Sequence, residues 1–255
     1  MYAEERQQAM VQLISQQGRM SVAELSDNLS VTTETVRRDL SALERMGLIR
    51  RVHGGAVPAS ALASIESGIS ERDQANTEAK DAIAAAAIAL LPPPGSMIVI
   101  DAGSTTARFA ALLPRDHGLT VVTHAVPIAA RLAGLPHIDL VLLPGRVRPT
   151  THAAVGVDTV LALSDVRADV SFVATNGLSI AHGLTTPDRD EAATKRAIVA
   201  AGRRTVVLAD STKIGVESSL RFAALSDIDV LITDSGVSDE DASALAAADV
   251  EVVIA

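Results

Sequence analysis

Short apolar runs alternate with helical segments from about Thr77 to the end of the chain, and this alternation constrains the fold more than any other feature. The apolar runs are expected to be strands, at Met97–Asp101, Leu119–Thr123, Asp139–Leu143, Ser171–Ala174, Thr205–Ala209, Val230–Thr233 and Val250–Ile254. Helical periodicity fills the intervals, at Thr105–Leu113, Pro127–Ala133, Asp158–Ser164, Asp190–Ala201 and Asp239–Ala247. Strands of this kind, separated by helices, indicate an open, mostly parallel α/β sheet with both faces covered.

The first part of the chain has a different pattern. Residues 1–57 show helical periodicity followed by a short, glycine-containing β-like segment. Residues 58–75 are rich in Ser and Ala and have only weak periodicity, which is typical of a linker. We therefore expect a small N-terminal unit at 1–57, a linker at 58–75 and an α/β domain at 76–255.

Three helices are predicted in the N-terminal unit, at Ala3–Gln17, Val22–Leu29 and Thr33 to about Met46. Ser21 followed three residues later by Glu24 is a capping box, which marks the start of the second helix. Thr32 is the expected N-cap of the third helix. The segment from Leu48 to Val57 is expected to form a two-stranded ribbon with its turn or end at Gly54-Gly55. Together these elements predict a winged helix-turn-helix.

The third helix has an apolar stripe at Val36, Leu40 and Leu43, so its other side faces solvent. A recognition helix presents polar side chains near its N-terminus to base edges and phosphates. The expected DNA contacts, with a helix-turn-helix from about Ser21 to Leu40, are Thr33, Thr35, Arg37, Arg38, Ser41, Arg45, Arg51 and His53. A solvated helix face is the alternative interpretation of these positions.

The distribution of charge agrees with a DNA contact better than the total does. The chain has a formal net charge of −9. Residues 1–57 are neutral, however, and all of the excess acid lies in 58–255. Five Arg stand against two acidic residues between Arg37 and Arg51. A short basic face on an acidic protein favours sequence-specific binding assisted by dimerisation over indiscriminate coating of DNA.

Composition excludes several kinds of chemistry. The chain has no Cys, which rules out disulfides, Cys-ligated zinc, iron–sulfur ligation and thiol catalysis. The longest apolar run, Ala82–Leu91, is about half a membrane span, and residues 1–12 lack a secretory apolar region. We expect a cytoplasmic protein without cofactor or metal. His124 is expected to be a hydrogen-bonded loop residue, because no partner spacing supports a metal site.

Gly103-Ser104-Thr105-Thr106 follows the first apolar run directly and opens a helix. Backbone N–H groups at a helix N-terminus and neighbouring hydroxyls form an anion site. An ordinary N-capped turn explains the same residues equally well. The turn is not a P-loop, because it lacks the Lys and the required Gly spacing.

Two further clusters hold charged residues in suitable places. Glu191 and Lys195 lie in the run Pro187–Lys195, where a surface ion pair between them is the simple alternative. Asp210 and Lys213 follow a strand, where open α/β sheets bind ligands. Only three Lys stand among 22 Lys and Arg residues, so Lys195 and Lys213 indicate positions that need a compact ammonium group.

Three N-terminal stretches form one long motif: Val31–Leu40, Leu43-Glu44 and Arg51–Ala56. This motif resembles the DNA-binding module of the DeoR family of sugar-responsive repressors. The resemblance implies that the third helix reads an operator. Most of 77–255 also resembles the sensor domain of that family, which is similar in fold to ribose-5-phosphate isomerase. An effector-binding and oligomerisation domain at 76–255 follows from this likeness.

The resemblance implies that the turn at 103–106 holds the phosphate and that the charged clusters surround the sugar. Other matching loops are Leu143–Arg146, Gly156 and Asn176-Gly177. Thr123-His124-Ala125 and Leu-Pro-Gly-Arg depart from the family's Thr-Asn-Ser and Leu-Gly-Gly. The expected effector contacts are Asp101, Gly103, Ser104, Thr105, Thr106, Arg146, Arg148, Asn176, Gly177, Asp188, Glu191, Lys195, Asp210 and Lys213.

These expectations describe a repressor of a sugar-catabolic operon and not an enzyme. The repressor is expected to act as a homodimer or higher oligomer on double-stranded operator DNA. Met1–Ala9 and Gly145–Thr151 look most like the fructose-operon repressors within the family, which favours fructose 1-phosphate as effector. A second anionic contact from Arg146 and Arg148 would admit fructose 1,6-bisphosphate. The alternatives are an isomerase-like enzyme fused to a DNA-binding module, and an activator or a regulator with another effector.

Overall fold

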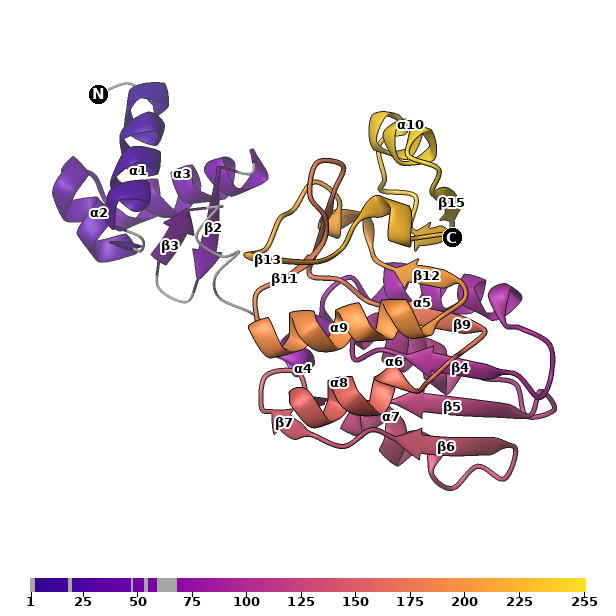
Figure 1. Cartoon of the computed structure of the whole chain (residues 1–255). Helices are drawn as coiled ribbons and strands as arrows, with labels where there is room; N and C mark the ends of the chain where they lie inside the picture. The colour runs from indigo at the N-terminus through magenta and orange to yellow at the C-terminus, as the bar shows by residue number, and fades with distance from the viewer. Residues whose placement is uncertain (1–2, 18–19, 47, 53–54, 59–67) are drawn as a thin grey trace. The chain divides into compact units, whose positions relative to one another are not determined.

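The computed structural model describes residues 3–17, 20–46, 48–52, 55–58 and 68–255 (Figure 1). The chain divides into two compact units, Met1–Glu66 and Ser67–Ala255. Among the described residues, no helix has both the length and the apolar character needed to cross a membrane.

The N-terminal unit contains three helices and a small antiparallel sheet in the strand order β1-β3-β2. Its elements are α1 (Ala3–Gln17), β1 (Met20–Ser21), α2 (Val22–Leu29), α3 (Thr33–Arg45), β2 (Ile49–Val52) and β3 (Gly55–Pro58). The predicted helices and the two-stranded ribbon are present. The third strand, β1, was not predicted, because two residues are too few to show a period.

Local capping and a small apolar core explain why these helices begin and pack as they do. Ser21 Oγ accepts a hydrogen bond from the Glu24 N–H at 3.1 Å, and the Ser21 N–H donates to Glu24 Oε2 at 2.7 Å. This capping box confirms the prediction for α2. The Thr32 side chain accepts from the N–H of Thr35, so Thr32 is the N-cap of α3. The side chains that α1, α2 and α3 bury together include Met10, Ile14, Leu25, Val36 and Leu40.

The C-terminal unit is built on a seven-stranded sheet in the order β15-β14-β12-β9-β4-β5-β6, in which every pairing is parallel. The strands are β4 (Met97–Ile100), β5 (Leu119–Thr123), β6 (Ile138–Leu142), β9 (Val170–Val173), β12 (Thr205–Leu208), β14 (Val230–Thr233) and β15 (Glu251–Ile254). Each corresponds to one of the seven predicted runs. The expected α/β fold with an N-terminal helix-turn-helix is confirmed.

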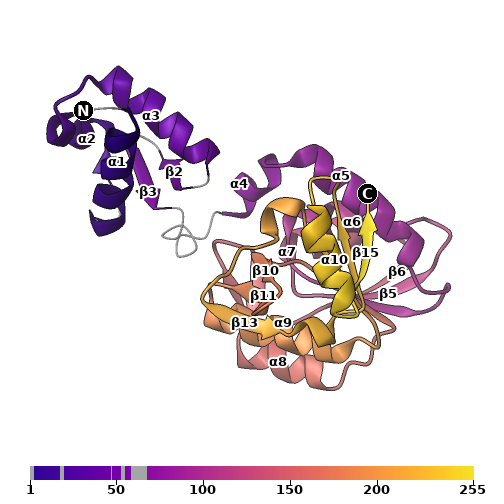
Figure 2. The same ribbon diagram turned by 90° about the horizontal axis from the view of Figure 1, so that it is seen from above.

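Helices cover both faces of this sheet (Figure 2). They are α5 (Thr77–Ala87), α6 (Ser104–Ala111), α7 (Val126–Leu132), α8 (Val157–Ser164), α9 (Arg189–Ala201) and α10 (Asp239–Ala247). One apolar core lies beneath α5, α6 and α7 and contains Ile83, Phe109 and Ile128. The other lies beneath α8, α9 and α10 and contains Ile198 and Leu245. Strands buried on both faces explain the continuous apolar runs in the sequence.

Several short elements were not predicted. They are α4 (Ile69–Gln74), the hairpin of β7 (Arg146–Arg148) and β8 (Ala153–Val155), and a small sheet of β10 (Gly177–Ser179), β11 (Gly183–Thr186) and β13 (Leu220–Ala223). The structure differs from the predicted linker at 58–75, because α4 lies inside that range and packs against α6. The Ile69 N–H donates to the Thr150 carbonyl at 2.8 Å, so a tertiary contact anchors this short helix. Residues 59–67 of the predicted linker are outside the described residues.

Candidate functional site

The solvent side of α3 presents the side chains predicted to contact DNA. Thr33, Arg37 and Arg38 are exposed, and Thr35 and Ser41 are half-buried. The Arg37 side chain is 54% exposed, and its guanidinium lies 3.4 Å from Glu34 Oε2. Since a surface ion pair at this distance is weak, Arg37 remains available to a phosphate or a base.

The structure covers two further predicted contacts in part and a third not at all. Arg45 lies in the last turn of α3 and Arg51 lies in β2, but their side chains are outside the described residues. His53 is outside the described residues altogether, as is Gly54 of the predicted turn.

A buried ion pair fixes α3 against α1, and sequence reasoning missed it. Arg6 Nε lies 2.6 Å from Asp39 Oδ2, and Gln7 Nε2 donates to Asp39 Oδ1 at 3.1 Å. Burial by itself would raise the pKa of Asp39, but the hydrogen bonds from Arg6 and Gln7 more than offset it, so the pKa lies below its usual value. One signal was available: Asp39 falls on the same helical face as Val36 and Leu40, where a carboxylate needs a partner.

In the C-terminal unit, the predicted effector residues gather at one edge of the sheet. Asp101 follows β4, Asn176 follows β9 and Asp210 follows β12, and these three strands are neighbours (Figure 1). Parallel strands end at the same edge, which is where open α/β sheets bind ligands. Helix α9 and its N-cap supply the remaining carboxylates, Asp188 and Glu191, together with Lys195.

The N-terminus of α6 has no side-chain cap. Ser104 and Thr105 are 8% and 5% exposed, and Thr106 Oγ1 donates to the Gly103 carbonyl at 3.1 Å. A Cβ on Gly103 would lie 2.7 Å from the Ala174 Cβ, so only glycine lets this turn approach the β9 loop. Free N–H groups at the start of a helix, with hydroxyls beside them, suit an anion.

Asp101 is the centre of a fully buried polar cluster. Its Oδ2 contacts Lys195 Nζ and accepts from the Ala174 N–H at 2.9 Å, and its Oδ1 lies 2.9 Å from His124 Nε2. Burial alone would raise the pKa of Asp101, but the charge of Lys195 and the contact with His124 lower it from 3.8 to about 2. His124 Nδ1 also lies 2.8 Å from the Ala154 carbonyl, so this histidine is a buried, hydrogen-bonded residue.

The cluster continues along α9 as a chain of ion pairs. Lys195 Nζ lies 3.9 Å from Glu191 Oε1, and Glu191 contacts the Arg148 guanidinium. Arg148 Nε is 3.4 Å from Asp188 Oδ2, and Asp188 is the N-cap of α9. Glu191 and Lys195 are 2% and 1% exposed, so they are not the surface pair that their spacing alone would allow.

A second cluster forms around Asp210, which lines a cavity of about 470 Å³. Asn76 Nδ2 and the hydroxyl of Thr212 both donate to Asp210 Oδ1, the former at 3.0 Å. Lys213 belongs to the 3-10 helix η3 (Ser211–Lys213) beside them. Lys80 is buried and donates to the carbonyls of Arg72 and Ala75; sequence reasoning missed its role.

Lys80 also shows the cost of burial directly. Desolvation lowers its pKa, and the nearby Lys213 and Arg108 charges add to that effect, while Asp210 works against it. The ammonium lies on the last carbonyls of α4, where a cation is favoured by the helix dipole.

The other predicted residues lie further from these clusters. Arg146 is 64% exposed on its side chain and contacts Asp190 at 2.8 Å. Asn176 Oδ1 accepts from the Thr186 hydroxyl at 3.2 Å. A Cβ on Gly177 would lie 2.3 Å from the Val216 carbonyl oxygen, which explains glycine there. Within the described part of the chain, no group of three His, Cys, Asp or Glu side chains is arranged to hold a metal ion.

Comparisons with known proteins agree with this arrangement. Residues 6–61 match the family described as the DeoR-like helix-turn-helix domain, and residues 75–235 match the DeoR C terminal sensor domain. An HTH-type transcriptional regulator, GlpR, of Haloferax volcanii is 36% identical over 98% of this chain and 96% of its own length. The HTH-type transcriptional regulator FruR of Bacillus subtilis is 34% identical over 92% of both chains. The glycerol-3-phosphate regulon repressor of Escherichia coli is 31% identical over 91% of this chain and 90% of its own.

Solved structures are similar at lower levels. Ribose 5 phosphate isomerase A from Neisseria gonorrhoeae is 17% identical, with a TM-score of 0.39 over 57% of this chain and 55% of that one. The eIF2B beta structure from Chaetomium thermophilum is 12% identical, with a TM-score of 0.45 over 91% of this chain and 85% of that one. The matched families and the relatives in the preceding comparison are regulators and not enzymes. The chain therefore belongs to the DeoR family of DNA-binding transcriptional regulators.

Proposed function

We propose that this regulator represses a sugar-catabolic operon in the cytoplasm and that a phosphorylated sugar controls its affinity for operator DNA. The observation that carries the proposal is the uncapped N-terminus of α6 beside the Asp101–Lys195 pair. The helix end supplies N–H groups and the hydroxyls of Ser104 and Thr105 for a phosphate. Among the neighbouring charged groups, the half-buried Asp188 and Lys213 supply hydrogen bonds for a sugar.

We assign operator contacts to α3 and to the ribbon that follows it. The exposed Thr33, Arg37 and Arg38 are placed to meet base edges and phosphates. Thr35, Ser41, Arg45, Arg51 and His53 complete the proposed set. Residues 1–57 thus read DNA, and 76–255 bind the effector and join copies of the chain. Because one helix-turn-helix covers a single half-site, the working form is a homodimer or a higher oligomer on a repeated or palindromic operator.

Fructose 1-phosphate is the favoured effector, and glycerol 3-phosphate is the main competitor. One relative is named FruR and another is a glycerol-3-phosphate regulon repressor, so similarity alone does not separate them. The arginines expected to bind a second phosphate differ in availability. Arg148 is 9% exposed and already contacts Glu191 and Asp188, whereas Arg146 is exposed. Because Arg148 is already held in ion pairs with Asp188 and Glu191, it is not available for a second phosphate. A ligand with one phosphate therefore suits the site better than fructose 1,6-bisphosphate.

Titration calorimetry of the full chain with four sugar phosphates tests the effector assignment. Fructose 1-phosphate should bind more tightly than fructose 6-phosphate, fructose 1,6-bisphosphate or glycerol 3-phosphate. An inducer must bind the DNA-free form more tightly than the DNA-bound form. Fructose 1-phosphate should therefore weaken binding to an operator selected from random duplex DNA, while free fructose has no effect. A preference for glycerol 3-phosphate would overturn the fructose assignment and leave the DNA-binding role intact.

A further inference from the structure

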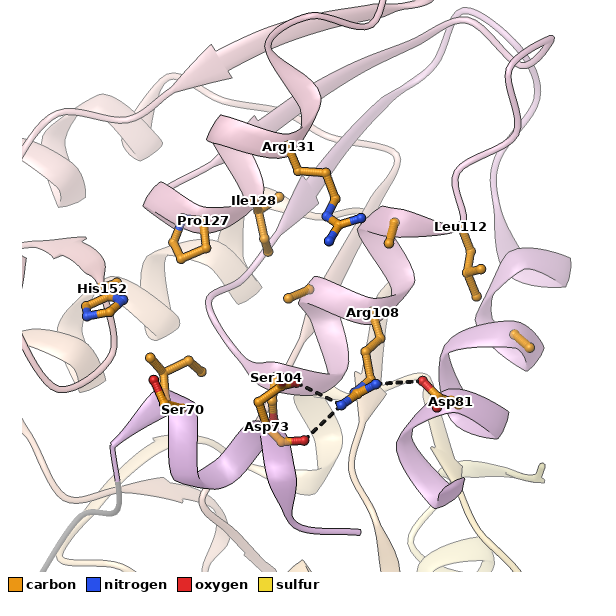
Figure 3. A pocket seen from close by; sticks show the side chains of 14 residues that line it. Ser70, Asp73, Asp81, Ser104, Arg108, Leu112, Pro127, Ile128, Arg131 and His152 are labelled. Atoms are coloured by element: carbon orange, nitrogen blue, oxygen red, sulfur yellow. Dashed lines mark hydrogen bonds and ion pairs between the residues drawn. The ribbon is translucent and has the colours of Figure 1, made fainter. Parts of the chain in front are cut away.

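A cavity of about 710 Å³ lies on the face of the sheet that α5, α6 and α7 cover (Figure 3). Helix α4 forms one wall, and the loop that contains His152 closes one end. Much of its lining is apolar, with Leu112, Pro127 and Ile128 among the larger side chains. A cavity of a few hundred Å³ with apolar walls and a few polar groups is typical of a small-molecule site.

Two guanidinium groups reach this cavity from neighbouring helices. Arg108 on α6 donates to Asp81 Oδ1 at 2.8 Å and to Asp73 Oδ1 at 2.9 Å. Its third nitrogen, Nε, is buried and has no hydrogen-bond partner among the described residues. Arg131 on α7 is exposed and has no hydrogen-bond or ion-pair partner in the part of the chain that the structure describes; Figure 3 shows its guanidinium extending from α7 toward α6, the helix that carries Arg108.

Arg108 Nε needs an acceptor that the described protein atoms do not provide, and the exposed Arg131 is available to the same ligand. A buried N–H without a partner is rare in native structures and indicates a bound water, ion or ligand. Arg131 adds a positive charge that neither Asp73 nor Asp81 contacts, since both carboxylates are held by Arg108. A carboxylate is a planar acceptor that matches the guanidinium fork, so it would pair with Arg131 and accept from Arg108 Nε.

We propose that this cavity binds a small organic acid, with its carboxylate between Arg108 and Arg131 and its apolar body against Leu112, Pro127 and Ile128. The site is separate from the proposed sugar-phosphate site, because the Asp101–Lys195 cluster does not line it. Ser104 is the one residue shared by this lining and the expected effector contacts. The occupant would touch α4, α6 and α7 together and would hold α4 in place.

Hexanoate is a suitable probe, because it combines one carboxylate with a short apolar body. Titration calorimetry on the full chain compares it with hexan-1-ol, which lacks the charge, and with inorganic phosphate, which lacks the apolar body. Hexanoate should bind at least about tenfold more tightly than either control, as expected for an added charge-assisted hydrogen bond. The absence of hexanoate binding at millimolar concentration, or equal binding of all three compounds, overturns the proposal.

Variants then locate the site. Arg131→Gln should weaken hexanoate binding about tenfold or more, because it removes the charge and keeps much of the side-chain volume. Ala111→Phe should abolish binding by filling the cavity from α6. The matched control is Arg115→Gln, since Arg115 is exposed and does not line the cavity. Unchanged hexanoate binding in both cavity variants contradicts the proposed site. Displacement of hexanoate by fructose 1-phosphate contradicts a carboxylate site that is separate from the sugar-phosphate site. Neither conclusion depends on how the protein binds operator DNA.

Discussion

Replacing Lys195 by Met tests whether the buried cluster holds the C-terminal unit together. The substitution keeps the apolar length of the side chain and removes the ammonium that contacts Asp101. Asp101 is 0% exposed, so its carboxylate cannot turn to water for compensation. His124 and the Ala174 N–H remain, but they supply no fixed positive charge. We expect the free energy of unfolding at neutral pH to fall by about 3–5 kcal/mol, as when one partner of a buried pair is removed.

The pH dependence of the free energy of unfolding provides a second test of the same ion pair. The pKa of Asp101 is about 2 in the folded protein, against 3.8 for an ordinary Asp. A carboxyl group with a depressed folded pKa stabilises the fold above its unfolded pKa, and this stabilisation is lost as pH falls through the folded value. The difference in pKa corresponds to about 2–3 kcal/mol, lost between about pH 4 and pH 2. Without Lys195, burial dominates and raises the pKa of Asp101, so the gap between parent and variant should narrow over that range.

Urea unfolding followed by far-ultraviolet circular dichroism measures both effects. A double variant, Asp101→Asn with Lys195→Met, removes both charges and should recover about 2 kcal/mol or more of the loss. The control is Arg204→Met, because Arg204 and Glu251 form an exposed pair whose loss costs less than about 1 kcal/mol. If Lys195→Met costs no more than Arg204→Met, or if the double variant is as unstable as the single one, the cluster is not the stabilising element described above.

Three further perturbations address the other sites. Asp39→Asn should lower the free energy of unfolding of the N-terminal unit by about 3 kcal/mol, because Arg6 loses its buried partner. Since the pKa of Asp39 is lowered in the folded protein, the parent should also lose stability as the pH falls below the usual pKa of an Asp, and thermal unfolding at several pH values checks both effects. Arg38→Ala should cost about 1–3 kcal/mol of operator affinity if the side chain contacts a base, and parent-like affinity in a fluorescence anisotropy titration would contradict that contact. Ser104→Ala combined with Thr105→Ala should abolish the response to the sugar phosphate and leave basal operator binding intact. Loss of basal operator binding, or an unchanged response to the sugar phosphate, would each count against the phosphate site.

The sequence alone determined most of the regular structure. The seven strands and the caps at Ser21 and Thr32 follow from residues that lie within a few positions of one another. Hydrophobic period and capping are local properties, so they can be read along a chain without knowing what packs against it. The family motifs are equally local, so the sequence by itself marks the helix-turn-helix and the turn at 103–106.

Short elements needed the tertiary structure. Helix α4 has six residues, too few to be stable or to show a period without neighbours. It forms because Thr150, Arg108 and Lys80 hold its two ends. The same reasoning applies to the three-residue strands β10 and β7, whose partners define them.

The pairing of charged and polar side chains was decided by the tertiary structure alone. Arg6 and Asp39 are 33 positions apart, Asp101 and Lys195 are 94 apart, and Asn76 and Asp210 are 134 apart. Which of these groups meet depends on the order of strands in the sheet and on the face that each helix covers, and neither is a property of a local window. The sequence thus supplied the types of residue that an anion site requires. The fold decided that Lys195 lies between Asp101 and Glu191 in the interior, while the end of α6 stays open.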